Sequence, residues 1–379
     1  MNKDISVRIC HITTVHNVFD VRIFYRECVT LAKNGYEVYL IGAYNKEIYT
    51  NGVRIIPLPE RRSRLFRFFI KDWIALVKSF KVKAKIYHFH DPELIPMGII
   101  LKLFGKKVIY DVHENISLQI AAKNWIPPSA RTIISRIFFV IEKIALRFFD
   151  HIIVAGEDIK EQTHFKPFHY KISLLRNLPV VDIDKSIMKE KKFDKIRFVY
   201  TGGMTKDRGI LEIVKAANKV GSDKFELLLI GTFKSNAFED RVKSFIEGSN
   251  RIIYISQLPY KQMFKFISKC HVGLICFKRT PNNVGALSGR NNKIYEYLQS
   301  GLAVIGSNFP EWKKFIVGNK IGLVVDPNKV DEIAEAMLYF INNTEQLKTM
   351  ERNAKDLSYK YIWRNEQKIL LDIYKELLR

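Results

Sequence analysis

Apolar runs of strand-like length alternate with helix-like runs along almost the whole chain, and this alternation constrains the fold more than any other feature. Helix-like segments such as 24–36, which ends near Gly35 at a position suited to a C-cap, separate the strand-like runs. Parallel strands need a helical crossover between them, so the pattern predicts an α/β fold built on doubly wound parallel sheets. The predicted strands of the first half are 7–15, 37–43, 53–59, 86–91, 107–114, 151–157 and 171–177.

A charged segment, 178–195, interrupts this rhythm, and the alternation then begins again. With 379 residues, the chain is longer than one ordinary core requires. We therefore predict two Rossmann-like domains with parallel sheets facing a central cleft. Their limits are an N-terminal domain at 1–180, a linker at 181–195 and a second domain at 196–361, with a C-terminal amphipathic helix at 362–379 that packs back on the first domain. The predicted strands of the second half are 196–203, 225–231, 251–257, 271–277, 302–307 and 322–326.

Polar residues follow several predicted strands of the first half, and ligands of open parallel sheets bind outside the carboxyl ends of the strands. His88 and His90 alternate along one strand; we expect one of them to face the core and neither to bind a metal. Asp20 and Arg22 form either an ion pair of the loop or part of a pocket, and His113 is either a core histidine or a site residue. The candidate site residues of this half are His16, Asp20, Arg22, Asp111, His113 and Glu114.

The segment TGGMTKDRG (201–209) has the character of a phosphate-binding turn. Gly202 and Gly203 follow a predicted strand, where a backbone without side chains can approach a ligand closely. Lys206 and Arg208 come next, and a helix begins near Gly209, so two cations and free N–H groups are available to a diphosphate. No GK[ST] follows and no GxGxxG opens the first domain, so the signatures of P-loop hydrolysis and dinucleotide redox chemistry are missing.

A single carboxylate, Glu296, lies in the helix-like stretch NNKIYEYLQ (291–299). A loop rich in Gly and Asn precedes this stretch, and the strand-like LAVIGS follows it. A loop, a short helix and a strand in this order commonly form a ligand site at the mouth of a parallel sheet. Glu296 is therefore either a ligand-binding acid or a helical acid paired with Lys293 three positions earlier.

The formal net charge of +23 indicates a polyanionic partner: nucleic acid, an anionic membrane surface or a phosphorylated substrate. Basic residues alternate with aromatic ones in 61–85 and 131–149, a composition typical of interfacial helices. The alternative is a packed helix with a solvated basic face. We favour the membrane surface for 61–85 and the core for 131–149. No helix-turn-helix, RNP or zinc-finger pattern supports nucleic-acid binding.

Cysteine usage and the termini bear on the compartment. Cys10, Cys28, Cys270 and Cys276 are scattered, with no CxxC pair and no His/Cys cluster at metal spacing, so we expect buried free thiols and no metal site. The chain enters its first strand without a signal-peptide pattern, and no run reaches the roughly 18 apolar residues of a membrane span. These features favour a cytoplasmic protein.

Five segments in their order carry a resemblance that extends over nearly the whole chain: FDVRIFYRECVTLAKNGYEVYLI, YHFHDPELIPMG, KVIYDVHE, YTGGMTKDRGILEIV and NNKIYEYLQSGLAVIGSNFPEW. Their combination resembles the family-4 retaining glycosyltransferases of the GT-B fold. The resemblance implies transfer of a sugar from a nucleotide diphosphate-sugar, UDP- or GDP-linked, to a lipid-linked or envelope polysaccharide acceptor, without metal or cofactor, at the inner face of the cell membrane. Other GT-B enzymes, a nucleotide-sugar epimerase or a glycan phosphorylase, are the alternatives.

The resemblance also assigns roles to residues. Glu296 would bind the ribose hydroxyls, Arg208 would take the diphosphate with help from Lys206, and His113 would act near the reacting sugar. The helix start at Asn292, Lys293 and Ile294 would contact the phosphates, while the site residues of the first half would border the acceptor. The chain departs from the family pattern at two positions: Ser288 stands where a first glutamate would contact the donor sugar, and Gly203 stands where an arginine would lie.

Overall fold

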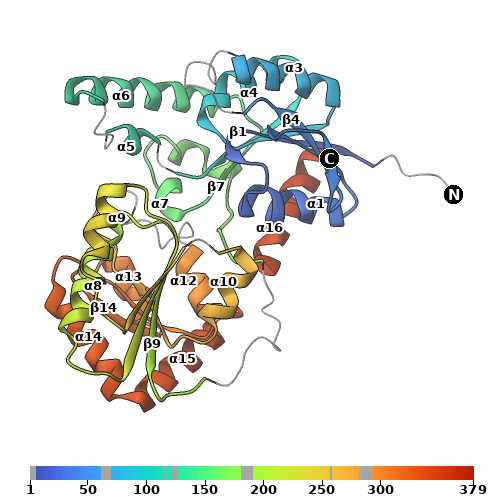
Figure 1. Cartoon of the computed structure of the whole chain (residues 1–379). Coiled ribbons are helices and arrows are strands. Elements are labelled where there is room, and N and C mark those ends of the chain that lie inside the picture. The colour runs from blue at the N-terminus through green and yellow to red at the C-terminus, as the bar shows by residue number, and fades with distance from the viewer. Residues whose placement is uncertain are drawn as a thin grey trace. The chain divides into compact units, whose positions relative to one another are not determined.

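The computed structural model describes residues 6–60, 70–114, 116–121, 126–180, 191–256, 258–280, 283 and 292–379. The chain divides into two compact units (Figure 1). Unit 1 comprises the described residues up to 180 together with 363–379, and unit 2 comprises those from 191 to 362. Within these residues, no helix is both long and apolar enough to cross a lipid bilayer.

Unit 1 is built on an eight-stranded sheet of order β3-β4-β2-β1-β5-β6-β7-β8, in which all pairs are parallel except the β3–β4 pair. The edge strand β3 is the one strand of this sheet that the sequence pattern missed, because it is only three residues long. The strands are β1 (Arg8–Asn17), β2 (Glu37–Ala43), β3 (Ile48–Thr50), β4 (Val53–Leu58), β5 (Ile86–Phe89), β6 (Lys107–Val112), β7 (His151–Val154) and β8 (Ile172–Leu174).

Helices cover both faces of this sheet, as a doubly wound fold requires (Figure 1). One face packs against α3, α4 and α6, and the other against η1, α1 and α16. The helical elements of unit 1 are η1 (Val21–Cys28), α1 (Val29–Lys33), α3 (Asp72–Val82), η3 (Pro92–Leu94), α4 (Ile95–Leu103), α5 (Ile116–Ala121), α6 (Pro128–Ala145), α7 (Glu157–Lys160), η4 (Lys166–Lys171) and α16 (Trp363–Leu378).

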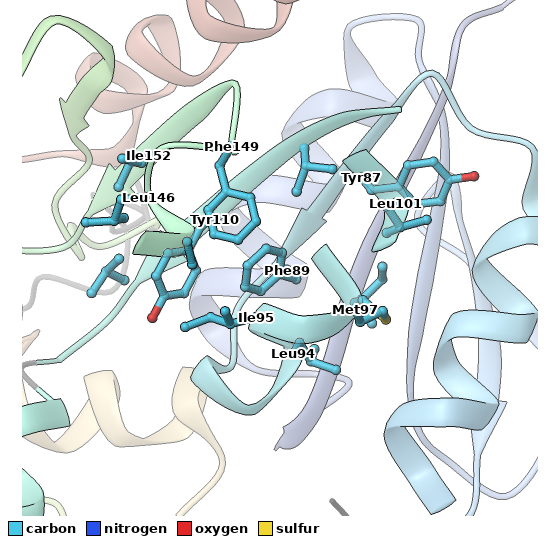
Figure 2. Close-up of a cluster of buried hydrophobic side chains, with 14 of the residues drawn as sticks. Tyr87, Phe89, Leu94, Ile95, Met97, Leu101, Tyr110, Leu146, Phe149 and Ile152 are labelled. Atoms are coloured by element: carbon cyan, nitrogen blue, oxygen red, sulfur yellow. The ribbon is translucent and has the colours of Figure 1, made fainter. Parts of the chain in front are cut away.

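Alternate residues of the central strands feed two separate apolar cores, since successive side chains of a strand point to opposite faces. On the α4 and α6 face, Phe89 stacks on Tyr110 with ring centroids 4.8 Å apart and meets Phe149 edge-on at 5.2 Å. Figure 2 shows these rings together with Leu146 and Ile95 between the strands and the helix layer. The residues labelled there are aromatic or aliphatic, whereas the opposite face of the sheet carries polar chemistry at its strand ends.

Two helical elements of unit 1 show how distant segments complete this fold. The segment predicted as one helix at 24–36 is a π-helix, η1, continued by the short α-helix α1. Asp20 caps η1 by accepting hydrogen bonds from the backbone N–H groups of Arg22 and Ile23. The C-terminal helix α16 lies on unit 1, where Trp363 Nε1 donates to Thr30 Oγ1 and Leu370 is fully buried. A chain segment far away in sequence therefore completes the core of the first unit.

Unit 2 is a six-stranded parallel sheet of order β11-β10-β9-β12-β13-β14. Its strands are β9 (Ile196–Thr201), β10 (Phe225–Ile230), β11 (Ile252–Ile255), β12 (Val272–Ile275), β13 (Ala303–Ser307) and β14 (Gly322–Val325). Its helical elements are η6 (Lys206–Arg208), α8 (Ile210–Lys219), α9 (Asn236–Lys243), α10 (Tyr260–Ile267), α12 (Asn292–Gln299), α13 (Pro310–Ile316), α14 (Val330–Asn342) and α15 (Thr344–Ser358). All six predicted strands are present, with ends one to two residues shorter than expected at several positions.

The four cysteines are buried and free, as expected. The two basic-aromatic segments are partly described. Residues 61–69 lie outside the described part of the chain, and the remainder of 61–85 contains α3, on which Trp73 is 62% exposed. The preference for a core location of 131–149 was wrong for most of that segment. On α6, Ile133, Ile137, Val140 and Ile144 are each about half exposed, because this helix buries only a narrow side.

Candidate active site

The glycine turn of unit 2 follows β9 and lies at the carboxyl end of the sheet. Gly202 has φ +107°, a conformation that favours glycine, and a Cβ there would lie 2.8 Å from Lys293 Cε and 2.9 Å from Lys293 Nζ. The hydroxyl of Tyr200 donates to the carbonyl of Gly203 at 2.7 Å and holds the turn. The missing side chain at Gly202 therefore makes the space that the Lys293 side chain enters.

Cationic side chains from three segments gather at this turn. The guanidinium of Arg208 lies 4.1 Å from the ring centroid of Phe277, and Lys293 Nζ lies 5.6 Å from the same centroid. Lys234, which follows β10, comes within 3.7 Å of the position that a Cβ of Gly203 would occupy. Burial and the neighbouring Arg208 and Lys234 charges lower the pKa of Lys293 to about 8. Positive charges that lie this close together, partly shielded from water, favour the binding of an anion.

Gly209, which separates η6 from α8, is a second position in this region where the backbone requires glycine. It has φ +70°, and a Cβ at this position would lie 2.0 Å from the carbonyl oxygen of Cys276. Only glycine allows α8 to begin so close to the end of β12, and this start directs its N-terminus toward the same strand ends. Asp207, whose carboxylate accepts from Asn283 Nδ2 at 3.2 Å, fixes the turn from the other side.

Helix α12 carries the predicted nucleotide-binding acid. Glu296 is 6% exposed and Ile294 is fully buried, while Asn292 and Lys293 at the helix start are half-buried. Tyr297 on the same helix anchors it to β9, since the backbone N–H of Thr201 donates to its hydroxyl at 3.1 Å. Unit 2 thus brings together Gly202, Gly203, Arg208, Lys293 and the N-terminus of α12. Lys206 lies on η6 and is exposed, whereas Ser288 falls outside the described residues.

In unit 1 the predicted site residues form a connected polar group at the ends of β1, β5 and β6. His113 Nε2 lies 3.0 Å from Asp111 Oδ2, and the rings of His113 and His16 are 5.0 Å apart. Asp91 accepts hydrogen bonds from the Thr13 hydroxyl at 2.9 Å and the Thr14 backbone N–H at 2.6 Å, which hold the second half of β1 in place. His113 and His16 are partly exposed and can reach a ligand, and Glu114 beside them is exposed.

Arg22 has a different setting from the one expected. It is 3% exposed and makes a bidentate pair with Asp111, with Nε to Oδ2 at 2.9 Å and Nη2 to Oδ1 at 2.8 Å. Its Nη1 donates to the Leu175 carbonyl and to Asn177 Oδ1. Among the described residues it forms no ion pair with Asp20, which caps η1 instead. Asp111 is fully buried, and the guanidinium of Arg22 holds its pKa well below the usual range despite that burial.

Sequence reasoning missed several residues of these two groups. Lys234 could have been predicted as a site residue, because it follows the carboxyl end of a predicted strand, as Lys206 does. Phe277 had no such signal, because an aromatic residue at the end of a predicted apolar strand is typical of the core. His90 was expected on the strand; it lies directly after β5, and both His88 and His90 are buried, so the expectation that only one faces the interior was wrong.

Residues 182–357 match the model of the group 1 glycosyl transferases, and residues 21–177 match the model of glycosyltransferase family 4. An uncharacterized glycosyltransferase of Methanocaldococcus jannaschii is 21% identical to this chain over 371 residues, covering 96% of this chain and 81% of that protein.

Solved structures with the same fold match over nearly the whole length. Sucrose-phosphate synthase from Thermosynechococcus elongatus has a TM-score of 0.75 at 18% identity, covering 98% of this chain and 99% of that one. Anabaena HepE in complex with UDP and glucose has a TM-score of 0.72 at 10% identity, covering 98% and 100%. WaaG, a glycosyltransferase involved in lipopolysaccharide biosynthesis, has a TM-score of 0.69 at 13% identity, covering 97% and 99%. These likenesses confirm the predicted GT-B fold, and the two family models confirm the resemblance seen in the sequence. The chain belongs to the group 1, family 4 glycosyltransferases.

Proposed function

We propose that this glycosyltransferase uses a nucleotide diphosphate-sugar, UDP- or GDP-linked, and binds its nucleotide on unit 2. The observation that carries the proposal is the convergence of Arg208, Lys293 and Lys234 on the Gly202–Gly203 turn, beside the helix that holds Glu296. Cations and helix N-termini are the groups that bind a diphosphate, and a carboxylate with two acceptor oxygens suits two ribose hydroxyls. HepE, which shares the fold, binds UDP.

The same arrangement suggests how the sugar is transferred with retention. The bond between the sugar and the diphosphate breaks as Arg208, Lys293 and the helix N-termini stabilise the charge on the leaving oxygen. The acceptor hydroxyl attacks from the same face, and its proton passes to the departing phosphate. His113, backed by Asp111 at 3.0 Å, orients the sugar. Protein cations supply the positive charge at the donor, so we propose that transfer needs no metal ion at the diphosphate.

Calorimetric titration with UDP, GDP, ADP and CDP tests the donor site. We expect one or two of the four to bind, and Arg208→Ala to weaken that binding by roughly 10-fold or more, as expected for a hydrogen bond to a charged group. The control is Lys219→Ala, which removes an exposed lysine at the far end of α8. Unchanged affinity in Arg208→Ala would remove this residue from the site. Assays with and without acceptor separate a transferase from an epimerase, which needs no acceptor.

We further propose that unit 1 binds an anionic membrane surface and takes a lipid-linked or envelope-polysaccharide acceptor there. Helix α6 presents exposed Ile137, Val140 and Ile144 beside exposed Arg136 and Lys143. An exposed apolar stripe with flanking cations is the composition of a helix that lies in a lipid interface, and the net charge of +23 favours an anionic one. Trp73 is 62% exposed on α3, which covers the same face of the sheet as α6 (Figure 1).

Co-sedimentation with vesicles tests this part of the proposal. We expect the protein to sediment with vesicles rich in phosphatidylglycerol and to stay in solution with neutral phosphatidylcholine. A DNA duplex added in excess is the competing polyanion. If DNA is retained tightly while anionic vesicles are not, the membrane proposal is wrong and the positive charge serves a nucleic acid.

A further inference from the structure

Three histidines and a glutamate converge in unit 1, on the face of the sheet that η1 and α16 cover. His11 and His88 are direct partners across the parallel strands β1 and β5, His90 follows β5, and Glu27 lies on η1. All four side chains are 0–2% exposed. One donor atom from each lies within 4.8 Å of every other donor atom.

The distances around Glu27 are nearly those of a coordination site. Its Oε2 lies 3.9 Å from each of three ring nitrogens, His11 Nδ1, His88 Nδ1 and His90 Nε2. His11 Nδ1 and His90 Nε2 are 3.0 Å apart. In a tetrahedral zinc site with bonds of about 2.0–2.1 Å, the donor atoms are roughly 3.3 Å from one another. A shift of about half an ångström in the Glu27 side chain brings its three distances into that range.

We propose that His11, Glu27, His88 and His90 bind a divalent transition-metal ion, with Zn²⁺ as the preferred ion. Three imidazoles and one carboxylate are a tetrahedral donor set that suits Zn²⁺. Mg²⁺ and Ca²⁺ prefer oxygen ligands, so a site with three nitrogens disfavours them. Because all four positions are filled by protein side chains, the ion would be structural and would take no substrate.

The surroundings of two histidines fix their ring orientation as metal sites require. His90 Nδ1 lies 3.1 Å from Asp111 Oδ2, so it carries the proton and leaves Nε2 as the lone pair that faces the cluster. His11 Nε2 lies 3.0 Å from the hydroxyl of Tyr374 on α16, with Nδ1 facing the cluster. A carboxylate or hydroxyl behind a ligating imidazole is the usual outer shell of a metal site.

Glu27 gives a second, independent sign that a cation belongs here. Its carboxyl group is fully buried; Oε1 forms an ion pair with Arg22 Nε at 3.1 Å, and Oε2 accepts no hydrogen bond from the residues that the structure describes. Oε2 faces the three imidazoles of the cluster at 3.9 Å each. Neutral imidazoles are the ligating form, and an ion among them would give Oε2 the cationic partner that Oε1 has in Arg22.

Ion binding would be accompanied by defined proton movements. A side chain ligates through a lone pair, so ion binding displaces any proton from the four donor atoms. The His11 proton, which faces His90 Nε2 across 3.0 Å, would move from Nδ1 to Nε2 and be donated to the Tyr374 hydroxyl. His88 Nδ1 lies 2.9 Å from the same hydroxyl, so the Tyr374 proton would turn away from it and leave its lone pair to the ion.

The ion would also tie together parts of unit 1 that are distant in sequence. Tyr374 contacts His11 and also lies 2.9 Å from His88 Nδ1, so α16 packs directly against the cluster. His90 Nδ1 lies 3.3 Å from His113 Nε2, next to the proposed sugar-binding histidine. The proposal does not depend on the proposed function, because it rests on the contacts among the four ligands and requires neither a nucleotide nor an acceptor.

Metal analysis of the full-length protein tests the proposal. The protein is expressed with added zinc, desalted and measured by inductively coupled plasma mass spectrometry. We expect about one zinc per chain, the occupancy of a closed structural site. Glu27→Gln and His88→Gln, which keep side-chain size, should lose most of the metal. His151→Gln is the control, since His151 is a buried histidine of β7 that bonds to Ser173 away from the cluster.

A cobalt-substituted sample tests the geometry without any variant, in case a substitution prevents folding. We expect the strong visible absorption of a four-coordinate Co²⁺ ion with nitrogen and oxygen ligands. Tyr374→Phe, an outer-shell change, should weaken zinc affinity by roughly 10- to 100-fold. If wild-type protein binds neither Zn²⁺ nor Co²⁺, or if Glu27→Gln retains the full metal content, the cluster is a hydrogen-bonded network and the proposal is wrong.

Discussion

The Lys293 side chain occupies the space in which a side chain at position 202 would lie. Gly202 has no side chain, Gly203 stands where the family pattern has an arginine, and the Lys293 ammonium lies beside this turn. A cation from α12 thus comes to the place of a cation missing from the turn after β9. A lysine at this place differs from an arginine in its titration. A lysine whose pKa is about 8 can lose its charge near physiological pH, whereas an arginine keeps its charge.

We therefore expect nucleotide affinity to depend on pH through Lys293. Burial and the Arg208 charge lower the pKa of Lys293, so its ammonium is charged below about pH 7 and is lost as the pH rises through about 8. Affinity for the nucleoside diphosphate should fall between pH 7 and 9.5, in titrations at constant ionic strength. Lys293→Met should bind roughly 10-fold or more weakly at pH 7 and show a flatter pH profile. Lys219→Met, at an exposed ion pair, is the control; an equal slope in Lys293→Met would contradict the assignment.

Glu296 is the residue-scale test of ribose recognition. Glu296→Gln keeps the shape of α12 but replaces a charged acceptor by an amide, so we expect nucleotide-sugar affinity to fall by roughly 10- to 100-fold while the folded state persists. Isothermal titration measures the affinity, and circular dichroism checks the fold. Glu345→Gln, at an exposed acid of α15, is the matched control. Wild-type affinity in Glu296→Gln would remove Glu296 from the ribose site.

The residues of unit 2 illustrate what a single sequence can reveal. The Gly202–Gly203 turn and Glu296 could be chosen as candidates from the sequence. Two glycines after a strand, and a lone acid near a helix start, are seldom required by the fold alone. The position of Lys293 was not visible, because its side chain reaches the turn only through the fold. The same holds for His11 and His88, which are 77 positions apart in sequence yet become partners when β1 pairs with β5.

At the scale of elements, the segment 24–36 is helical as predicted, and η1 shows what its sequence pattern could not reveal. Its sequence mixes apolar and charged residues, and the segment forms a π-helix that turns Arg22, Arg26 and Glu27 all into the interior. Such charged side chains read as a solvated face in a sequence. The fold buries them because Asp111 and Asn177 from distant segments meet them there. Periodicity predicts that a helix exists, but not which partners its polar face will find.

Helix α6 gives a prediction for the membrane surface. The double variant Ile137→Glu with Ile141→Glu places two carboxylates on an exposed apolar stripe, so it should leave the fold intact and abolish sedimentation with anionic vesicles. Each change removes up to about 1.5–3 kcal/mol of apolar burial in the lipid interface and adds repulsion from the anionic surface. Val317→Glu, an exposed apolar position of unit 2, is the control. Vesicle binding equal to that of the wild type would show that α6 does not contact lipid.

The C-terminal helix has an anchor that can be tested by stability. Trp363 is 4% exposed and donates to Thr30 Oγ1 at 2.8 Å, so Trp363→Ala removes a large buried ring and leaves a hydroxyl without its donor. We expect the free energy of unfolding to drop by about 3–5 kcal/mol, as for other buried aromatic truncations. Urea unfolding followed by far-UV circular dichroism measures the change, with Tyr359→Ala, at an exposed ring of unit 2, as the control. A change below about 1 kcal/mol would mean that the helix is anchored elsewhere.

At the scale of the whole molecule, each unit has its own sheet and its own buried apolar residues, and the proposed nucleotide contacts all belong to unit 2. A ligand that binds one folded unit stabilises that unit against local opening by mass action. The sequence repeat predicted two such units, because the strand and helix alternation starts twice. The amphipathic pattern at the C-terminus predicted a helix that returns to the first unit, but it could not identify Thr30 and His11 as neighbours of that helix, since pairing across the fold decides them.

Hydrogen exchange of the intact protein tests whether the nucleotide binds unit 2 alone. With UDP or GDP at 100 times its dissociation constant, we expect amides of 200–209 and 292–300 to gain protection worth about 2.7 kcal/mol where they exchange by opening of the bound unit. Amides of β1, β5 and β6 should exchange as in the free protein, because no proposed nucleotide contact lies there. Arg208→Ala, measured at the same nucleotide concentration, should lose most of the gain. Protection that appears first in unit 1 would place the nucleotide on the other sheet and would contradict the proposed roles of Lys293 and Glu296.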